Sequence, residues 1–406
     1  MTTEILPAAV VAGAFQTGVV LMRNLHRQGV RVYTFDIHDR FAGFKTRYAK
    51  ASVCPNPDEN PEQWLAWMKA LSRRIGGRPI LIASADRFVS AMGRYRDELT
   101  DDFRYCVDGV AAQAKLATKE QQYALAALQG MPVPRTEYAV NLEQVQAFAE
   151  DARYPCLFKP RHEREWGPAP AGHLLSGQKL VLASSREDLL AKYKQAQEVA
   201  SEVVLQELIE GPDTAKMVYL SCYSKDGRRL GWGVVKQLRT APILFGSASV
   251  VEPVMDAEAA DLCDRFLRSI DYRGLCEIEI KRDSRDGRVM LIEANPRFSV
   301  TADAAQYMGV DVGWIHYQDL AGVRLEEASP QAVDFRHIVL KRDFECIPSY
   351  LTAGLWSWAQ IFKSYRRPVY FFDADWRDWR VCLGTVWDLV KLALKPVVRR
   401  YIPKRV

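Results

Sequence analysis

Two stretches of strand-like sequence in the second half of the chain carry side chains that could hold a metal ion. Residues 275–281 read Leu-Cys-Glu-Ile-Glu-Ile-Lys, and residues 291–299 read Leu-Ile-Glu-Ala-Asn-Pro-Arg-Phe-Ser. Because strand side chains alternate between two faces, the two glutamates of the first stretch share a face, and so do the glutamate and the asparagine of the second. The segment between them, residues 282–288, contains Asp-Gly and favours a hairpin in which the two faces coincide. Oxygen ligands gathered in this way suit Mg²⁺ that also binds phosphates.

One of two lysines upstream, Lys159, could meet such phosphates. Lys119 follows Thr118, a plausible helix N-cap, and Lys159 interrupts an apolar strand at residues 154–160. A cation in a half-buried strand needs a partner, because an unpaired buried ammonium is costly. Phosphate is one such partner, and a structural salt bridge is the alternative for Lys159. Taken alone, Lys119 reads as a solvated helix residue.

The N-terminal part of the chain reads as a strand, a helix and further strands of a parallel sheet. Strands are expected at residues 8–12, 30–35 and 79–83, and the last of these leads into Ser84 and Asp86. In a doubly wound sheet the strand ends line the ligand crevice, so Ser84 and Asp86 are candidates for substrate contact. Capping of the helix that follows is the alternative for both residues.

The turn after the first strand carries glycines that could aim backbone amides at an anion. Gly13 and Gly18 flank it, and Asp36 ends the second strand, which allows a nicotinamide dinucleotide site as one hypothesis. The spacing lacks the middle glycine of the usual fingerprint, so the sequence favours this hypothesis weakly.

Composition places the chain among globular proteins that act on small molecules. Its 406 residues suffice for two or three domains, and a formal net charge of +5 gives little support for nucleic-acid binding. Eight scattered cysteines without a CxxC pair indicate reduced thiols and a cytoplasmic protein. We expect no signal peptide, and no apolar run reaches the roughly 20 residues that span a bilayer.

The string Ile-Glu-Ala-Asn-Pro-Arg at residues 292–297, after a Glu-x-Glu strand, resembles the metal-binding hairpin of the ATP-grasp superfamily. Members of this superfamily join a carboxylate to an amine through an acyl phosphate. The resemblance implies ATP and Mg²⁺, with Mn²⁺ as a substitute, as cofactors. It further implies that Glu279 and Glu293 bridge the metal and the phosphates, that Asn295 completes the coordination, and that Arg297 faces the reacting phosphoryl group.

The resemblance also assigns the nucleotide site. Two lysines would reach the triphosphate, and the segment after a strand at residues 203–207 would seat adenine and ribose. A loop at residues 161–177 would fold over the phosphates, although it departs from the shorter glycine-rich form of the family. A solvated strand-end carboxylate is an equal alternative for Glu207. The expected nucleotide contacts are Lys119, Lys159, Gln206, Glu207, the backbone near Ile209, and Asp213.

Two further basic residues lie near a loop upstream of the hairpin. Lys236 and Arg239 end a strand before residues 240–246, and they would suit an acidic substrate or the transferring phosphate. We predict a catalytic role for both, with solvated basic side chains as the alternative.

The resemblance implies a mixed α/β and α+β fold of three parts. Residues 1–112 would form a small Rossmann-like open sheet, doubly wound, that precedes the ATP-grasp domain. Residues 113–325 would form that domain, with a first lobe at 113–205 and a second at 206–325. Residues 326–406 would form a helical, Trp-rich C-terminal extension, which lies beyond the resemblance.

The end of this extension combines apolar residues with Lys and Arg at helical spacing. Such a stripe could lie on an anionic membrane surface or dock on the body of the protein, and the second alternative is the more common. The tryptophans of the region are Trp356, Trp358, Trp376, Trp379 and Trp387.

The sequence therefore predicts a cytoplasmic ligase that binds a carboxylate and an amine and no nucleic acid, with peripheral contact at the inner face of the membrane as a hypothesis. The layout resembles the bacterial branch that includes D-aspartate ligases of cell-wall synthesis and ligases from polysaccharide gene clusters. Dimers are common in such relatives, which makes a homodimer an expectation. The alternatives are a small-molecule kinase on the same scaffold, a nicotinamide-binding protein, and a membrane-peripheral scaffold with an inactive nucleotide pocket.

Overall fold

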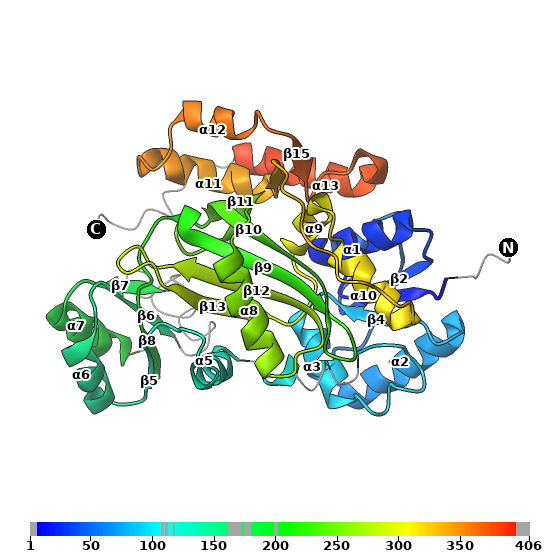
Figure 1. Ribbon diagram of the computed structural model, residues 1–406, viewed down its shortest axis with the longest axis horizontal. Helices are drawn as coiled ribbons and strands as arrows, with labels where there is room; N and C mark the ends of the chain where they lie inside the picture. The colour runs from blue at the N-terminus through cyan, green and yellow to red at the C-terminus, as the bar shows by residue number, and fades with distance from the viewer. Residues whose placement is uncertain are drawn as a thin grey trace. The chain divides into compact units, whose positions relative to one another are not determined.

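The computed structural model describes residues 6–106, 109, 113–116, 118–160, 173, 180–198 and 202–394 (Figure 1). The chain forms two compact units. Unit 1 comprises Met1–Met131, Pro212–Lys281 and Glu293–Val406, and unit 2 comprises Pro132–Gly211 and Arg282–Ile292. This division into two units does not test the predicted domain boundaries, which therefore stay a prediction.

The N-terminal part of unit 1 is the predicted parallel open sheet. Its strand order is β3-β2-β1-β4, and every neighbouring pair is parallel. Alternate residues of β1 enter two cores, because Ala9 and Val11 pack with α1, whereas Val10 and Ala12 pack with α2 and α3. Helices thus cover both faces, as a doubly wound sheet requires. The elements are β1 (Ala9–Ala12), α1 (Gln16–Arg27), β2 (Val32–Asp36), η1 (Ala42–Phe44), β3 (Lys50–Val53), α2 (Pro61–Ile75), β4 (Ile80–Ala83) and α3 (Asp86–Arg94).

The turn between β1 and α1 depends on its glycines. Gly13 has φ +114°, and a Cβ on Gly18 would lie 2.0 Å from the Gly13 carbonyl oxygen. The Asp36 carboxylate accepts hydrogen bonds from the Ala14 and Ile37 amides, each at 2.8 Å, and is buried. The Asp36 carboxylate therefore stabilises the turn between β1 and α1.

A seven-stranded sheet forms the rest of unit 1, in the order β13-β12-β9-β10-β11-β14-β15. The predicted hairpin is present, and the strands at residues 216–223 and 229–241 form an antiparallel pair. The last two strands come from the C-terminal extension, whose other described elements are helices, as predicted. The strands are β9 (Lys216–Tyr223), β10 (Arg229–Ala241), β11 (Ser247–Pro253), β12 (Gly274–Arg282), β13 (Val289–Asn295), β14 (Arg336–Ile338) and β15 (Val369–Phe371).

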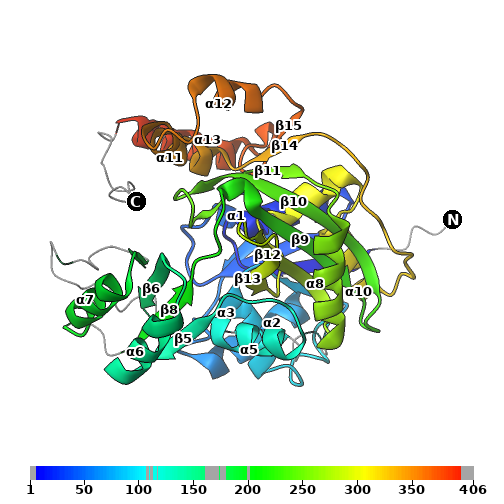
Figure 2. The same cartoon turned by 60° about the vertical axis from the view of Figure 1, so that its left-hand side comes forward.

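Helices of unit 1 pack on this sheet. Contacts join α8 and α10 to β9, and α11 to β10 and β11. The C-terminal helices lie together beside β11, β14 and β15 in both views (Figures 1 and 2). The remaining elements of unit 1 are α5 (Lys119–Leu128), η2 (Asp213–Ala215), α8 (Ala257–Ser269), α9 (Ala302–Ala305), η3 (Gln306–Met308), α10 (Val312–Ala321), α11 (Leu340–Thr352), α12 (Trp358–Ser364), η4 (Trp376–Asp378) and α13 (Trp379–Leu394).

Unit 2 is a small α+β body. Its antiparallel sheet has the order β5-β8-β6-β7, and α6 and α7 pack against each other through a buried apolar core that includes Phe148 and Tyr193. Two of these strands, β6 and β8, lie where the sequence predicts them, at residues 154–160 and 203–207. The predicted phosphate-covering loop at 161–177 lies, apart from His173, outside the described residues. The elements are β5 (Thr136–Ala139), α6 (Leu142–Asp151), β6 (Cys156–Pro160), β7 (Val181–Ala183), α7 (Arg186–Ala196) and β8 (Val203–Glu207).

The eight cysteines form no disulfide, and seven of them are buried. Unpaired thiols are therefore confirmed, and the predicted cytoplasmic location stays a prediction. Within the described ranges, none of the helices combines the length and the hydrophobicity that a membrane span requires.

Candidate active site

The hairpin β12–β13 brings its polar side chains onto one face. The Asn295 Nδ2 donates to Glu277 Oε1 at 3.1 Å, so the side chains of the two strands meet as the alternation predicts. Helix α5 is fixed to the same hairpin, because the buried Gln122 side chain donates to the Ala294 carbonyl at 2.9 Å and accepts from the Ala294 amide at 2.8 Å. The predicted N-cap, Thr118, accepts from the Gln121 amide at 3.2 Å.

This arrangement places Lys119 beside the acidic hairpin. Its Nζ lies 3.4 Å from Glu293 Oε2. Burial, and then the negative charges of Glu277 and Glu293, raise the pKa of Glu279 to about 8, while Lys216 and Lys119 oppose that rise. Three carboxylates therefore crowd one another more than the nearby lysines can offset.

Arg297 joins the hairpin to the N-terminal sheet. Its Nε and Nη2 donate to the two carboxylate oxygens of Asp86 at 2.6 and 3.1 Å, and Nη2 also donates to Asn295 Oδ1 at 3.3 Å. Asp86 begins α3, whose N-cap is Ala85 without a side-chain bond, so the capping alternative is wrong for Ser84 and Asp86. The buried Ser84 hydroxyl instead donates to the Ala12 and Gly13 carbonyls, at 3.2 and 3.1 Å.

The predicted nucleotide residues of unit 2 form their own chain of contacts. Lys159 Nζ donates to Gln206 Oε1 at 2.7 Å, and Gln206 Nε2 donates to the Thr136 hydroxyl at 2.9 Å. Residue 159 on β6 and residue 206 on β8 lie on paired strands, which explains their approach. Glu207 donates its amide to the Arg135 carbonyl, and Ile209 is buried.

Asp213, predicted to meet the ribose, lies in unit 1 and is buried. Its carboxylate accepts from the Leu244 amide at 3.1 Å and from the Tyr350 hydroxyl, and Lys216 Nζ lies 3.2 Å away. These contacts hold the carboxylate inside the protein, so its role at the ribose stays a prediction.

The two predicted catalytic residues of β10 differ from each other. Lys236 forms a cross-strand ion pair with Glu252 at 2.7 Å and is about one-third exposed, so its role stays a prediction. The Arg239 side chain is 0% exposed and donates to both oxygens of Asp343 at 2.8 Å. It also donates to the Ser364 hydroxyl at 3.0 Å and packs under the Trp356 ring. No accessible donor is left for a substrate, so we assign Arg239 to the core and correct its predicted catalytic role.

We compared the sequence and the fold with those of known proteins. The sequence matches no protein-family model. It is 25% identical over 273 residues to a D-aspartate ligase of Enterococcus faecium (strain Aus0004), a match that covers 62% of this chain and 62% of that protein. The chain thus spans less than two thirds of the length of this relative.

Solved structures share the architecture over most of the chain. An N5-carboxyaminoimidazole ribonucleotide synthetase in complex with ADP aligns with a TM-score of 0.61 at 15% identity, covering 81% of each chain. The biotin carboxylase domain of the Hydrogenobacter thermophilus 2-oxoglutarate carboxylase, in complex with MgADP, ADP and bicarbonate, aligns with a TM-score of 0.58 at 15% identity, covering 80% of this chain and 72% of that one. The chain therefore has the ATP-grasp fold.

The sequence pattern does not mark Glu277 of the same hairpin as a site residue. Glu277 is buried, and its second carboxylate oxygen accepts from the hydroxyls of Ser299 and Thr301. A carboxylate only accepts hydrogen bonds, and a guanidinium only donates them. Asn295 lies between Glu277 and Arg297, so both neighbours impose the same orientation on its amide, with the nitrogen toward Glu277. The hydroxyl residues Ser299 and Thr301, which follow Arg297 in the sequence, are the signal that could have indicated a role for Glu277.

The donor set of this ATP-grasp site fits a divalent cation that also has phosphate ligands. Within the part of the chain that the structure describes, no group of three or more His, Cys, Asp or Glu side chains is arranged to hold a metal ion alone. Glu279, Glu293 and the Asn295 amide oxygen offer hard oxygens. Burial, together with the negative charges of Glu277 and Glu293, raises the pKa of Glu279, and a cation among these oxygens would offset those charges.

Proposed function

We propose that this ATP-grasp protein is a ligase that joins a carboxylate to an amine. A carboxylate oxygen of the first substrate attacks the γ-phosphorus of ATP, and ADP leaves. The amine nitrogen then attacks the carbonyl carbon of the acyl phosphate, phosphate leaves, and the nitrogen loses a proton. The observation that carries the proposal is the convergence of Glu279, Glu293, Asn295, Arg297 and Lys119 in unit 1.

Each residue has a defined task in this proposal. Glu279, Glu293 and Asn295 would hold Mg²⁺, with Mn²⁺ as a substitute. The metal supplies positive charge that offsets the phosphate oxygens. Lys119 and Arg297 add fixed cations beside the same oxygens. The Asp86 carboxylate, bound bidentately by Arg297, holds that guanidinium in place until a substrate competes for it.

The proposal keeps the predicted nucleotide contacts of unit 2 and the lower-ranked residues of unit 1. Lys159 would contact the α and β phosphates, and Gln206, Glu207 and the backbone near Ile209 would seat the adenine. The Lys159 to Gln206 bond supports this, since it aligns both side chains on paired strands. Lys236 remains a candidate for an acidic substrate.

Two rival functions are weaker. A small-molecule kinase would use the same cluster without an amine, and similarity to a protein named D-aspartate ligase favours ligation. A nicotinamide-binding protein would need the Asp36 carboxylate at a ribose, but this buried carboxylate accepts from the Ala14 and Ile37 amides.

A screen of ADP release tests the function. Purified protein with Mg²⁺ and ATP is given pairs of amino acids and sugar acids, D-aspartate among the amines. We expect ADP formation only when both an acid and an amine are present, and a product with the mass of the two joined with loss of water. ADP formation with the acid alone, together with a stable phosphorylated product, would establish the kinase instead.

We further propose that Glu277 orients the Asn295 amide toward the metal. We expect Glu277→Leu to weaken Mn²⁺ binding about 10- to 100-fold, because the Asn295 amide loses the partner that orients its oxygen. Glu277→Gln should retain most of the affinity, since a glutamine oxygen can accept from Asn295 while its NH₂ donates to Ser299 or Thr301. Electron paramagnetic resonance of Mn²⁺ with a non-hydrolysable ATP analogue measures this without turnover. Equal losses in both variants would make Glu277 itself a ligand.

The setting of the ligase is also a proposal. We propose that the ligase acts in cell-wall or polysaccharide synthesis, in the cytoplasm and as a homodimer, as the resemblance of the sequence implies. We extend the proposal to peripheral contact at the inner face of the membrane through the C-terminal helix.

A further inference from the structure

Helix α13 is apolar on two sides, and the protein covers one of them. The side toward the body includes Val381, Cys382, Thr385, Asp388 and Leu389, which are buried or half-buried. The opposite side is exposed at helical spacing. A helix that is apolar all round is normally covered on all sides. The expectation that the stripe docks on the protein's own body is therefore half right, because a second apolar side remains.

Polar contacts fix which side of α13 faces the body. Thr385 donates to the Asp373 carbonyl at 3.0 Å, and Lys341 Nζ of α11 lies 2.8 Å from the Asp388 carboxylate. The Cys382 thiol donates to the Asp375 carbonyl at 2.8 Å. With these contacts made, the helix cannot turn its exposed side inward without breaking them.

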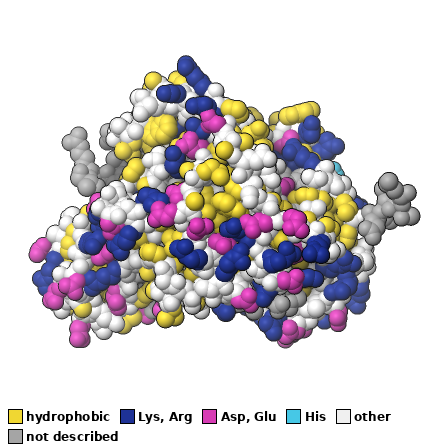
Figure 3. Space-filling model, viewed as in Figure 1, with side chains coloured by type: hydrophobic (Ala, Val, Ile, Leu, Met, Phe, Trp, Pro, Cys, Tyr) yellow, Lys and Arg dark blue, Asp and Glu magenta, His cyan; other side chains and the backbone are white. Residues whose placement is uncertain are grey.

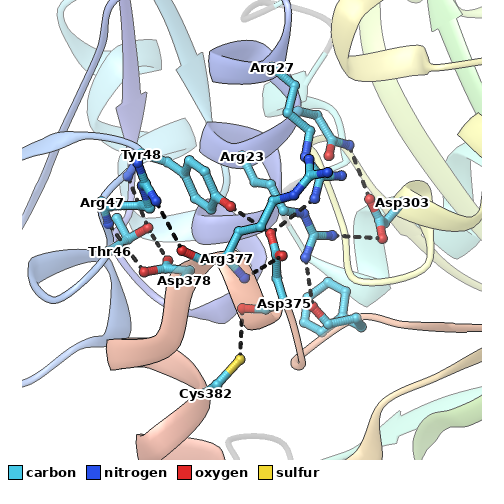
Figure 4. Close-up of polar contacts among 12 residues, drawn as sticks. Arg23, Arg27, Thr46, Arg47, Tyr48, Asp303, Asp375, Arg377, Asp378 and Cys382 are labelled. Atoms are coloured by element: carbon cyan, nitrogen blue, oxygen red, sulfur yellow. Dashed lines mark hydrogen bonds and ion pairs between the residues drawn. The ribbon is translucent and has the colours of Figure 1, made fainter.

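Hydrogen bonds hold the segment that leads into α13 against the N-terminal part of unit 1 (Figure 4). Asp375 accepts from the Tyr48 hydroxyl at 2.7 Å and from Arg27 at 3.0 Å. Asp378 is buried and accepts from the Thr46 hydroxyl and, at 3.3 Å, from the Arg47 amide. Both aspartates point inward in Figure 4, so the negative charges at this end of the helix lie away from its exposed side.

The exposed side forms a continuous stripe, here called the tryptophan face. Trp376 is 80% exposed, Trp387 59% and Trp379 58%, although tryptophan is normally among the well-covered residues. Trp379, Leu383 and Trp387 follow one another at intervals of four residues, which puts them on one side of α13, and Trp376 precedes Trp379 by three residues. The tryptophan face consists of Trp376, Trp379, Leu383, Val386, Trp387 and Val390.

Cations accompany every ring of the tryptophan face. The guanidinium carbon of Arg377 lies 5.5 Å from the Trp376 ring centre and that of Arg380 5.3 Å from the Trp379 ring, and Lys391 Nζ lies 5.4 Å from the Trp387 ring. Residues 395–406, beyond the described part of the chain, contain five Lys or Arg and no Asp or Glu in their sequence. Figure 3 likewise shows hydrophobic side chains among Lys and Arg over the C-terminal helices on the face in view.

We propose that the tryptophan face docks on the surface of an anionic lipid bilayer, with α13 lying in the plane of the interface. Tryptophan next to Lys or Arg suits the boundary between acyl chains and headgroups, where the ring enters the apolar layer and the cation meets anionic lipid. The charge of the face selects this occupant, because a second copy of the chain would bring the same cations against one another. The inference extends the proposed location of the ligase, and its test needs no turnover.

Vesicle flotation of the full-length chain tests the docking. We expect it to float with vesicles that contain phosphatidylglycerol and to stay in the dense layer with neutral phosphatidylcholine vesicles at the same salt. The triple variant Trp379→Ala, Leu383→Ala and Trp387→Ala should lose at least about tenfold in partitioning, since apolar burial and charge act together in such helices. All three side chains are exposed, so circular dichroism and thermal unfolding should match those of the wild type.

A matched control replaces exposed apolar residues elsewhere in unit 1. The double variant Leu128→Ala and Met255→Ala removes side chains that are 81% and 55% exposed, and it should float as the wild type does. The proposal is overturned if the wild type stays below anionic vesicles, or if the triple variant floats equally well. It is also overturned if light scattering shows a dimer that the triple variant abolishes without any vesicle binding, because the face then belongs to a second copy. ADP formation by the triple variant reports separately on the ligase.

Discussion

Replacing Glu293 with glutamine is expected to lower substrate-dependent ADP formation at least about a hundredfold while the protein stays folded. A bridging carboxylate that binds the metal is worth several kcal/mol, and each 1.36 kcal/mol of barrier is a factor of ten in rate. Glutamine keeps the shape of the side chain but removes its charge. The ion pair of Glu293 with Lys119 is about half exposed on the lysine side, so its loss changes stability little.

Coupled measurement of ADP release, with thermal unfolding of the same samples, checks this prediction. Glu327→Gln is the matched control, because it also removes one carboxylate of an ion pair, that with Arg229 at 2.7 Å. This control should retain wild-type turnover. Equal turnover by Glu293→Gln and the wild type would contradict the metal assignment.

Arg239→Met is expected to destabilise the protein by about 3–5 kcal/mol, because it leaves the Asp343 carboxylate buried without its cation. Both side chains of this pair are 0% exposed. The substitution also removes the hydrogen bond to the Ser364 hydroxyl and the cation–π contact with the Trp356 ring. Urea unfolding, followed by fluorescence, measures the change in the free energy of unfolding.

The double variant Arg239→Met with Asp343→Leu separates the core role from a catalytic one. Removing both charges should recover part of the lost stability, since no unpaired ion remains. ADP formation per folded molecule should then be close to that of the wild type. A folded double variant without turnover would restore Arg239 to the catalytic residues.

Local patterns were sufficient for the elements that position the candidate site. The alternation within residues 275–281 and 291–299 placed Glu277 near Asn295, as the 3.1 Å bond shows. The parallel N-terminal strands and the small sheet of unit 2 were likewise readable, because apolar runs, glycines and prolines mark their limits. These signals act over a few residues and need no knowledge of distant partners.

The features that the sequence did not predict depend on contacts between residues far apart in the chain. Arg239 appeared suited to a substrate because its buried partner, Asp343, lies 104 residues further along the chain. The three-residue strands β14 and β15 carry little periodicity, and their pairing defines them. Glu277 and Glu279 share a face, so alternation does not separate their roles. The hydroxyls of Ser299 and Thr301 make that distinction in the folded protein.

The contacts of Asp375 and Asp378 with the first fifty residues have a consequence for biosynthesis. Thr46 and its partner Asp378 are separated by 332 positions. At about 5–20 residues per second, a ribosome needs tens of seconds to supply the second after the first. During that interval the side chains of Tyr48 and Arg27 stay exposed to water, because their acceptor Asp375 has not yet been synthesised. Nascent chains arrested before residue 375 should therefore expose this surface to chaperones and proteases, and completion of the last helix should close it.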